Sequence, residues 1–494
     1  MEYNSLCKID NVSGSRSNWG SNRKKIIRDG EYVYTFVNYI HPDNPENLNI
    51  GPDTEYNQVY IYFVVARDGE QPVFSKDYFL ASGNATMLLD SKRRLHAFYF
   101  KPDRKNENNI YPYKGKIVHV TFPNPGDLNV YSEEDITPGW EEGNATELNF
   151  SSFYFGADID EADRIMLVYE NTPGGGGIKD SYTLSCRYGI LDENGNYQWK
   201  YQRVKEMSTR HCYPTVLSTP DGWYVCAVQD QNISSGEYQF DELRIFFAPA
   251  ENPLRSRIKA KVKDIRKRLE SKNPGAWADS ASASVEEGAS DEIVEDDLVW
   301  DVVKVFDGAE GYFGFTFYGD LLLDKDRKTV HLVFVYGYYD YGKNQPSYNN
   351  QTYEYWKGVK GSWNKQWNIP EGENYQPIKG NGKMRPQHPW EGTNIIRLNQ
   401  TRDSLYFICN SWSILYAYRN AIDESSRVMI YSFGEATKRN IEEGNPEEPE
   451  IEGYNTFTCA PQNSVVNQGV TDLVVYGNSD LEPQIAMLMT VKLE

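Results

Sequence analysis

Two short segments of the chain combine side chains that could bind a carboxylate and move protons. Each contains an arginine, a histidine and an aromatic residue: Arg210, His211 and Tyr213 in RHCYP, and Arg385, His388 and Trp390 in MRPQHPWEG. Arginine can neutralise a carboxylate, histidine can act as a base near neutral pH, and a tyrosine hydroxyl can supply a proton. This set suits removal of the proton beside a uronate carboxylate, the first step of β-elimination. We therefore predict Arg210, His211, Tyr213 and His388 as catalytic residues, with Arg385 and Trp390 binding substrate.

Other titratable residues offer a second chemistry. A glycoside hydrolase would need two carboxylates about 5 to 10 Å apart, and Asp103, Asp230 and Glu391 are candidates by location. His96 and His331 fall inside predicted strands, so we expect them to pack within the sheets. Hydrolysis by paired carboxylates therefore stays open beside β-elimination.

The segments that must position these residues repeat along the whole chain. One hairpin phrase, two apolar strands around a polar turn, recurs with turns at Asp29, Asp90, Asp160, Asp221, Asp324 and Gln400. A weaker seventh copy lies between Asn455 and Tyr476. β units that repeat in this way are typical of propellers and solenoids. The repeat predicts an all-β fold, a seven-bladed β-propeller, with six or eight blades as alternatives.

The segments after each hairpin predict how a blade is completed. GKIVHVTF, DELRIFFAPA and SILYAYRNA supply third strands, and a more polar edge strand would follow. We expect ring closure to pair residues 6–12 with the C-terminal PQIAMLMTVKL, because an open propeller would leave two exposed edges. The whole chain, residues 1–494, is then one propeller domain.

Composition excludes several classes of partner. The formal net charge is −20, with 71 acidic and 51 basic residues, so nucleic acid and anionic membrane surfaces are not expected partners. Mean hydropathy is −0.67, and no apolar run approaches the length of a membrane span. The start, MEYNSLCKID, shows no signal peptide. We nevertheless favour an extracellular or periplasmic location, and we expect a monomer.

Cysteines and acidic turns give little sign of a metal. The six cysteines show no CxxC spacing, so no zinc site follows. Cys212 and Cys226 flank one hairpin and are expected to be buried thiols. Asp158, Asp160 and Asp163 could hold calcium, but a hairpin turn is the preferred explanation. We expect no cofactor, with structural calcium as the alternative.

One insertion interrupts the repeat at residues 251–300. Apolar residues recur at helical spacing after Pro253, basic residues cover the other faces, and an acidic run follows. This pattern predicts a basic amphipathic helix followed by an acidic loop. The helix could dock on an acidic partner or a membrane, but we favour packing against the side of the propeller.

Three of the repeated phrases resemble a known family. GNATMLLDSKRRLHAFYF, RHCYPTVLSTPDGWYVCAV and LLLDKDRKTVHLVFVYGYYD are similar, in the same order, to phrases of the BNR-repeat (sialidase-like) propellers that include ulvan lyases and related polysaccharide lyases. The resemblance covers about half the chain. It implies a propeller that cleaves a uronate-containing glycan by β-elimination.

The catalytic positions of those lyases are mostly not matched here. Gly83 stands where the family has a first catalytic histidine, next to a retained Asn84, and Pro102 and Asp103 stand near the second. Tyr213 is retained from the Tyr-Pro phrase. Gln229 or Asp230 replaces the expected arginine. The resemblance therefore implies a substrate-binding Asn84 and a catalytic Tyr213, but a site rebuilt from other residues.

A non-catalytic propeller is the alternative to an enzyme. Such a protein would bind glycan or protein through aromatic faces, for which the candidates are Trp19, Trp223, Trp356, Trp363, Trp367, Trp390 and Trp412. We include Trp19 among the substrate-binding residues. In either case the expected partner is a polysaccharide or oligosaccharide.

Overall fold

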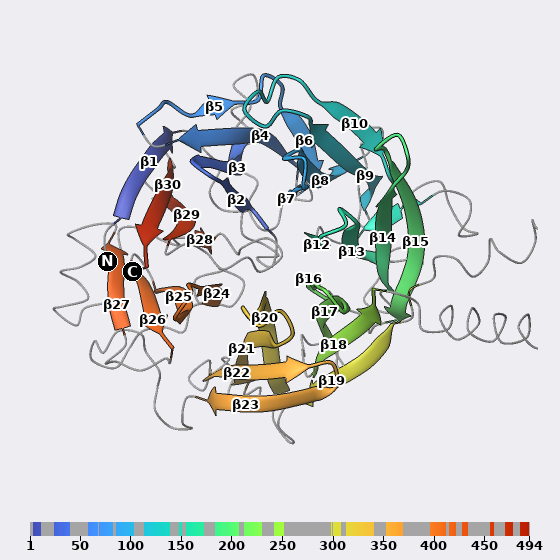
Figure 1. Cartoon of the computed structure of the whole chain (residues 1–494), viewed down its shortest axis with the longest axis vertical. Coiled ribbons are helices and arrows are strands. Elements are labelled where there is room, and N and C mark those ends of the chain that lie inside the picture. The colour runs from blue at the N-terminus through green and yellow to red at the C-terminus, as the bar shows by residue number, and fades with distance from the viewer. Residues whose placement is uncertain are drawn as a thin grey trace, which may run out of the picture.

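A computed structural model gives the fold. It describes residues 3–10, 24–39, 58–67, 69–82, 85–102, 113–138, 148–150, 155–171, 183–206, 212–229, 242–250, 298, 300–307, 313–339, 352–368, 396–411, 414–420, 427–432, 455–458, 470–477 and 485–493. All the described secondary-structure elements are β-strands. The sheets stand side by side around a common centre (Figure 1). The prediction of an all-β propeller is confirmed.

The described strands form seven antiparallel sheets. Each sheet takes its name from its strands. The β2–β6 sheet contains β2 (Ile26–Asp29), β3 (Tyr32–Tyr39), β4 (Gln58–Arg67), β5 (Val73–Phe74) and β6 (Phe79–Ser82), and the β7–β11 sheet contains β7 (Thr86–Leu89), β8 (Leu95–Pro102), β9 (Tyr113–Phe122), β10 (Ser132–Asp135) and β11 (Leu148–Phe150). The β12–β15 sheet contains β12 (Phe155–Ile159), β13 (Ile165–Asn171), β14 (Thr183–Leu191) and β15 (Tyr197–Glu206). The β16–β19 sheet contains β16 (Thr215–Thr219), β17 (Gly222–Gln229), β18 (Glu242–Pro249) and β19 (Asp301–Asp307).

The other three sheets complete the ring. They are the β20–β23 sheet, with β20 (Phe313–Leu323), β21 (Val330–Tyr339), β22 (Thr352–Val359) and β23 (Ser362–Asn368); the β24–β27 sheet, with β24 (Ile396–Gln400), β25 (Leu405–Ser411), β26 (Ile414–Arg419) and β27 (Arg427–Ser432); and the closing sheet, with β28 (Asn455–Thr458), β29 (Val470–Gly477), β30 (Ile485–Lys492) and β1 (Tyr3–Asp10). The strands β2, β7, β12, β16, β20, β24 and β28 lie nearest the centre (Figure 1).

The predicted ring closure is confirmed. β1 at the N-terminal end pairs antiparallel with β30 at the C-terminal end, from Tyr3 opposite Val491 to Asp10 opposite Ile485. Ends of the chain that are far apart in sequence therefore share one sheet. This pairing removes two sheet edges that could otherwise aggregate.

Tyr406 anchors the closing sheet to its neighbour. Its hydroxyl on β25 donates a hydrogen bond of 2.8 Å to the backbone carbonyl of Leu493, just after β30. Tyr406→Phe should lower the free energy of unfolding by about 1 kcal/mol, because a buried carbonyl loses its donor. Urea unfolding would show this as a lower midpoint. Tyr131→Phe, which removes an exposed hydroxyl bonded to Asp77, should leave the midpoint nearly unchanged; an equal shift would refute the anchor.

The hydrophobic core lies between neighbouring sheets. Alternate residues of each strand face opposite neighbours: Leu243, Ile245 and Phe247 of β18 pack toward the β20–β23 sheet, whereas Phe246 packs toward the β12–β15 sheet. Strands covered on both faces become nearly continuous apolar runs, as in the β8 sequence LHAFYFKP. Burying one large apolar side chain contributes about 1.5 to 3 kcal/mol. Each interface therefore fixes the relative position of two sheets.

The predicted hairpin turns all lie on one face of the ring, here called the hairpin face. Asp90 and Asp160 show why an acidic residue begins the turn. The carboxylate of Asp90 accepts the backbone N–H of Arg94 at 2.7 Å and its Nε at 2.6 Å. Asp160 and Arg164 repeat this arrangement at 2.9 and 2.6 Å. The aspartate thus satisfies the turn backbone and holds an arginine beside it.

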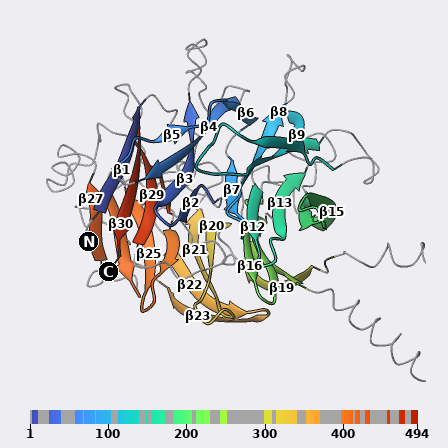
Figure 2. The same ribbon diagram turned by 45° about the horizontal axis from the view of Figure 1, so that its top comes forward.

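Polar contacts join these turns across the hairpin face. The contacts are Arg93 Nε to Asp29 at 2.6 Å, Ser91 N to Asp163 at 2.8 Å, Arg327 to Glu161, and Lys325 Nζ to the carbonyl of Arg402 at 2.9 Å. The opposite face, where the central strands begin, is here called the entry face. The two faces are seen obliquely in Figure 2.

The predicted helical insertion at residues 251–300 lies almost entirely outside the described residues. Only its last part is described: Leu298 and Trp300 pack against the interface between the β12–β15 and β16–β19 sheets. No helix in the described part of the chain has the length and hydrophobicity needed to cross a membrane.

Candidate functional site

Most of the predicted site residues fall outside the described part of the chain. These are Arg210, His211, His388, Asn84, Arg385, Trp390 and Trp19, and also the carboxylate candidates Asp103, Asp230 and Glu391. Tyr213 is the one predicted catalytic residue that the structure describes. Tyr213 therefore marks the described part of the predicted site.

Tyr213 lies just before β16, at the entry face. Its backbone φ is 46°, in the left-handed region that a bulky residue adopts only under constraint. The side chain is 3% exposed and packs with Leu217 and Leu243, toward the β20–β23 sheet. The sequence placed Tyr213 correctly at a strand entrance, but its ring belongs to the core.

Glu170 holds this strained segment in place. It lies near the end of β13, and its Oε1 accepts the backbone N–H of Cys212 and, at 3.0 Å, that of Tyr213. The residue is 1% exposed. A carboxylate so deeply buried at the end of an apolar strand is uncommon unless it is paired or functional.

Glu242 provides a second carboxylate on the neighbouring sheet. It is the first residue of β18 and is paired with Gln229, the last residue of β17. Its Oε2 accepts hydrogen bonds from Arg244 Nε at 2.7 Å and Nη2 at 2.6 Å. This fork holds the carboxylate in a defined orientation. Glu242 is 6% exposed.

The two carboxylates face the same interface between sheets. Along β13, Glu170 alternates in register with Met166 and Val168, which pack between the β12–β15 and β16–β19 sheets. Along β18, Glu242 shares its face with Phe246, which packs in the same interface. Both residues stand at the entry-face end of their strands, because β13 runs away from the hairpin face and β18 runs toward it. An apolar interface therefore ends in a polar cluster of Glu170, Glu242 and Arg244.

The cysteines near this cluster are not activated nucleophiles. Cys186, Cys212 and Cys226 are buried free thiols, as predicted for the last two. Burial raises the pKa of the Cys186 thiol to about 12 and also raises the pKa of the Cys212 and Cys226 thiols well above the ordinary value. Because the thiolate is the reactive form, these thiols serve as packing groups.

Two predicted aromatic binding residues are instead core residues. Trp223 is 1% exposed and lies against Tyr188 of the β12–β15 sheet. Trp363 is 9% exposed and packs with Tyr224 and Phe306. Their role as stacking surfaces for glycan is therefore wrong: large rings in these strands fill the space between sheets.

The predicted packing of the strand histidines is confirmed, since His96 and His331 are 0% and 3% exposed. The calcium candidates have separate partners. Asp158 accepts the N–H of Ser218, Asp160 binds its own turn, and Asp163 binds Ser91. In the described residues, no group of three or more histidine, cysteine or acidic side chains is arranged to hold a metal ion.

Comparisons with known proteins concern the fold. No protein-family model and no curated protein sequence matches the chain. Among solved structures, the polysaccharide lyase Uly1 is similar with a TM-score of 0.48 and 9% identity over 96% of this chain and 90% of that chain. An α-L-arabinofuranosidase from Fusarium graminearum, in complex with an iminosugar inhibitor, gives 0.43 and 10% over 83% and 92%. Levansucrase from Bacillus subtilis gives 0.32 and 11% over 75% and 88%.

Sequence reasoning missed Glu170 and Glu242 for a definable reason. The predicted carboxylate candidates stand between predicted strands, whereas Glu170 and Glu242 belong to strands. A signal was present: Glu170 ends the apolar run IMLVYE, and Glu242 begins the run ELRIFF. A charge at the end of a strand covered on both faces indicates the rim of an interface.

Proposed function

We propose that this protein is a glycan-cleaving propeller that hydrolyses glycosidic bonds at the entry-face cluster of Glu170, Glu242 and Arg244. The observation that carries the proposal is that two buried carboxylates stand at the entry-face rim of one interface, one on each of two adjacent sheets, in register with residues that pack in that interface. Glycoside hydrolysis needs one carboxyl group to protonate the leaving oxygen and a second to act as a base or nucleophile.

The two carboxylates are held by different donors. Glu242 is held by a guanidinium, which suits the group that must carry negative charge. Glu170 accepts backbone N–H groups from Cys212 and Tyr213, which fix the orientation of its carboxyl group, and we assign it the role of proton donor to the leaving oxygen. Cys212 precedes β16, and its carbonyl accepts the N–H of Val228 on β17, so it lies about two strand spacings, or about 10 Å, from Glu242 on β18. This offset is comparable to the roughly 5 to 10 Å between the carboxylates of glycoside hydrolases.

Electrostatics favour a neutral glycan over a polyuronate. The chain carries a net charge of −20, and its field repels polyanions at long range. The cluster itself contains two carboxylates and one guanidinium, so its formal charge is also negative. A uronate carboxylate would add a third negative group beside them.

β-Elimination of a uronate glycan is the second candidate. It is favoured by Tyr213, which stands at the entry face with a constrained backbone beside a segment that contains Arg210 and His211. A phenol, a guanidinium and an imidazole could supply the groups that elimination needs. The resemblance to polysaccharide lyases supports the same chemistry.

One assay separates the two candidates. The full-length protein would be incubated with neutral glycans (arabinan, xylan, galactan, glucan) and with uronate glycans, and the products scored for new reducing ends and for ultraviolet absorbance of an unsaturated uronate. We expect new reducing ends from a neutral glycan without that absorbance. Absorbance from a uronate glycan would favour elimination instead. No cleavage of any glycan in the panel would contradict both hydrolysis and elimination and would favour a non-catalytic propeller that binds glycan.

A further inference from the structure

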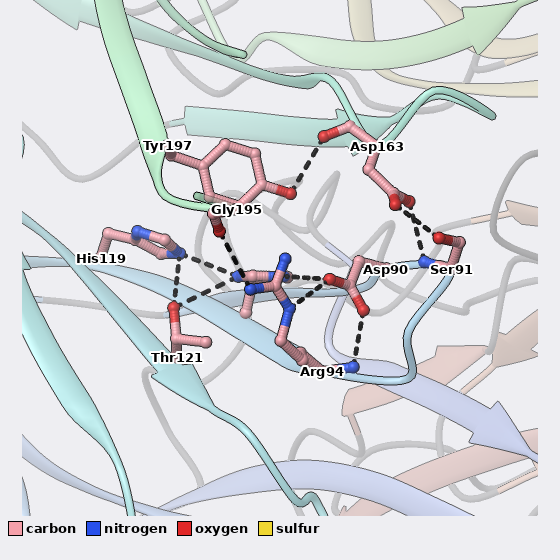
Figure 3. Close-up of polar contacts among 9 residues, drawn as sticks. Asp90, Ser91, Arg94, His119, Thr121, Asp163, Gly195 and Tyr197 are labelled. Atoms are coloured by element: carbon pink, nitrogen blue, oxygen red, sulfur yellow. Dashed lines mark hydrogen bonds and ion pairs between the residues drawn. The ribbon is translucent and has the colours of Figure 1, made fainter. Parts of the chain in front are cut away.

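A chain of four titratable groups, Asp90, His96, His119 and Glu134, lies in the β7–β11 sheet, away from the carboxylate cluster. Figure 3 shows Asp90 and His119 with Arg94, Thr121 and Tyr197 beside them. The centre of this chain of groups is a contact of 3.0 Å between His96 Nδ1 and His119 Nε2. The outer nitrogens face carboxylates: His96 Nε2 lies 3.4 Å from Asp90, and His119 Nδ1 lies 3.4 Å from Glu134. The chain runs from a fully buried Asp90 to a half-exposed Glu134.

The histidine pair also forms part of the contact with the next sheet. Tyr197 of β15 packs edge to face against both imidazoles, and Trp199 packs against His119. Trp199 Nε1 also donates to Glu134 at 3.2 Å. A change in the charge of the histidine pair would therefore alter the packing energy between the β7–β11 and β12–β15 sheets.

The charged groups around the pair come from every element packed on it. Asp90 and Arg94 belong to the β7–β8 turn, Asp163 to the β12–β13 turn, Glu134 to β10, and Arg187 to β14. Thr121 of β9 lies 3.4 Å from His96 Nδ1 and 3.2 Å from His119 Nε2. Tyr197 is the titratable neighbour on β15, and its hydroxyl donates to the carbonyl of Asp163.

The neutral histidine pair has one N–H group fewer than its three contacts need. Three contacts need an N–H: His96 to Asp90, His96 to His119, and His119 to Glu134. Two neutral imidazoles carry only two N–H groups. In the described structure the deficit falls on His96 Nε2, which has no hydrogen-bond partner. One added proton would complete all three contacts.

We propose that His96 and His119 act as a single acid-responsive unit that binds one shared proton, placed at His96 Nε2 and donated to Asp90, and so couples the packing of the β7–β11 and β12–β15 sheets to pH. The inference is independent of the proposed hydrolysis. In this unit the central N–H···N bond persists, and both carboxylates receive a donor once the proton is bound.

The sign of the pH effect follows from burial. Burial lowers the pKa of His119 from its ordinary value of about 6.5 to about 4, and it lowers the pKa of His96 as well. Burial alone would raise the pKa of Asp90, but the imidazole of His96 close by and the hydrogen bonds from Arg94 lower it to about 2. The pair is therefore neutral at pH 7. Below about pH 6.5 the two histidines bind protons in the unfolded chain but not in the folded chain. The free energy of unfolding therefore falls as the pH is lowered, down to about pH 4.

Side-chain NMR of the full-length protein labelled with ¹⁵N-histidine tests the proposal directly. The sequence has six histidines, and His96→Gln and His119→Gln spectra would assign the two signals. In a titration from about pH 7.5 to about pH 3.5, both rings should change in one step well below about pH 6.5. His96 Nε2 should move from the unprotonated to the protonated position in that step.

Two results would overturn the unit. The first is separate titration of the two rings, and the second is a His96 Nε2 that is already protonated at neutral pH. The titration of the wild-type protein is informative even if the variants do not fold, because the proposal requires two of its histidine signals to titrate together. As a stability readout, the urea midpoint of wild type should fall between about pH 7 and about pH 5 more steeply than that of a His96→Gln/His119→Gln variant. His331→Gln, at another buried histidine, is the matched control and should keep the wild-type slope; equal slopes in all three proteins would contradict the coupling.

Discussion

Glu170→Gln should lower the rate of glycan hydrolysis about 100- to 10,000-fold without unfolding the protein, because it removes the proton that the leaving oxygen requires. Glutamine has the shape of glutamate, and its carbonyl oxygen can accept the same backbone N–H groups of Cys212 and Tyr213. The left-handed backbone at Tyr213 should therefore be retained. Initial rates of reducing-end release from the best neutral glycan in the panel would measure the effect.

The matched control for this variant is Glu133→Gln. Glu133 is also a strand glutamate, but it pairs with Lys101 at the surface, away from the cluster. Its loss should leave the rate within about twofold, because surface ion pairs contribute little. Glu242→Gln should behave like Glu170→Gln, since hydrolysis needs both carboxylates. If both cluster variants keep the wild-type rate, the cluster is structural and the proposed site is wrong.

Local sequence signals were sufficient for the fold. Asp90 and Asp160 were recognisable as turn residues because their carboxylates satisfy the turn backbone through bonds to residues no more than four positions away. Pairing of β1 with β30 was predictable because a ring with open edges is unstable in water. Both inferences depend on short-range chemistry or on a general rule about edges.

Contacts between sheets were not predictable in the same way. The bond from Glu170 to the segment of Cys212 and Tyr213 joins residues that lie on different sheets and more than forty positions apart. Trp223 resembles a binding residue in sequence, and only the neighbouring sheet shows that its ring is core. The alternation of side chains along a strand shows which residues share a face of the sheet. In a ring of sheets both faces pack against a neighbouring sheet, so alternation does not show which neighbour a side chain contacts.

Lys24 forms a second long-range contact, whose removal should have the largest effect on stability. Its ammonium pairs with Asp158, and the side chains are 13% and 0% exposed. Lys24 precedes β2, whereas Asp158 lies on β12. The ion pair therefore joins the β2–β6 sheet to the β12–β15 sheet, although the β7–β11 sheet stands between these two sheets in the ring. The backbone of Lys24 also bonds to that sheet, through its carbonyl to Met87 N at 2.8 Å. One lysine thus connects three sheets near the centre of the ring.

Lys24→Met should lower the free energy of unfolding by about 3 to 5 kcal/mol, because it leaves the carboxylate of Asp158 buried without its cation. Asp158 would keep the N–H groups of Ser218 at 2.6 Å and Ile159 at 2.9 Å, but neutral donors do not balance the charge. The midpoint of urea unfolding at neutral pH would measure the loss.

Two further variants decide whether the cost comes from the unpaired charge. Lys24→Met/Asp158→Asn should recover a large part of the loss, because an asparagine oxygen can still accept a backbone N–H and carries no charge. Lys101→Met, which breaks the surface pair with Glu133, should cost less than about 1 kcal/mol. If Lys24→Met costs no more than Lys101→Met, the central pair does not hold the three sheets together. If the double variant is as unstable as the single one, the lysine stabilises the ring by packing and not by neutralising Asp158.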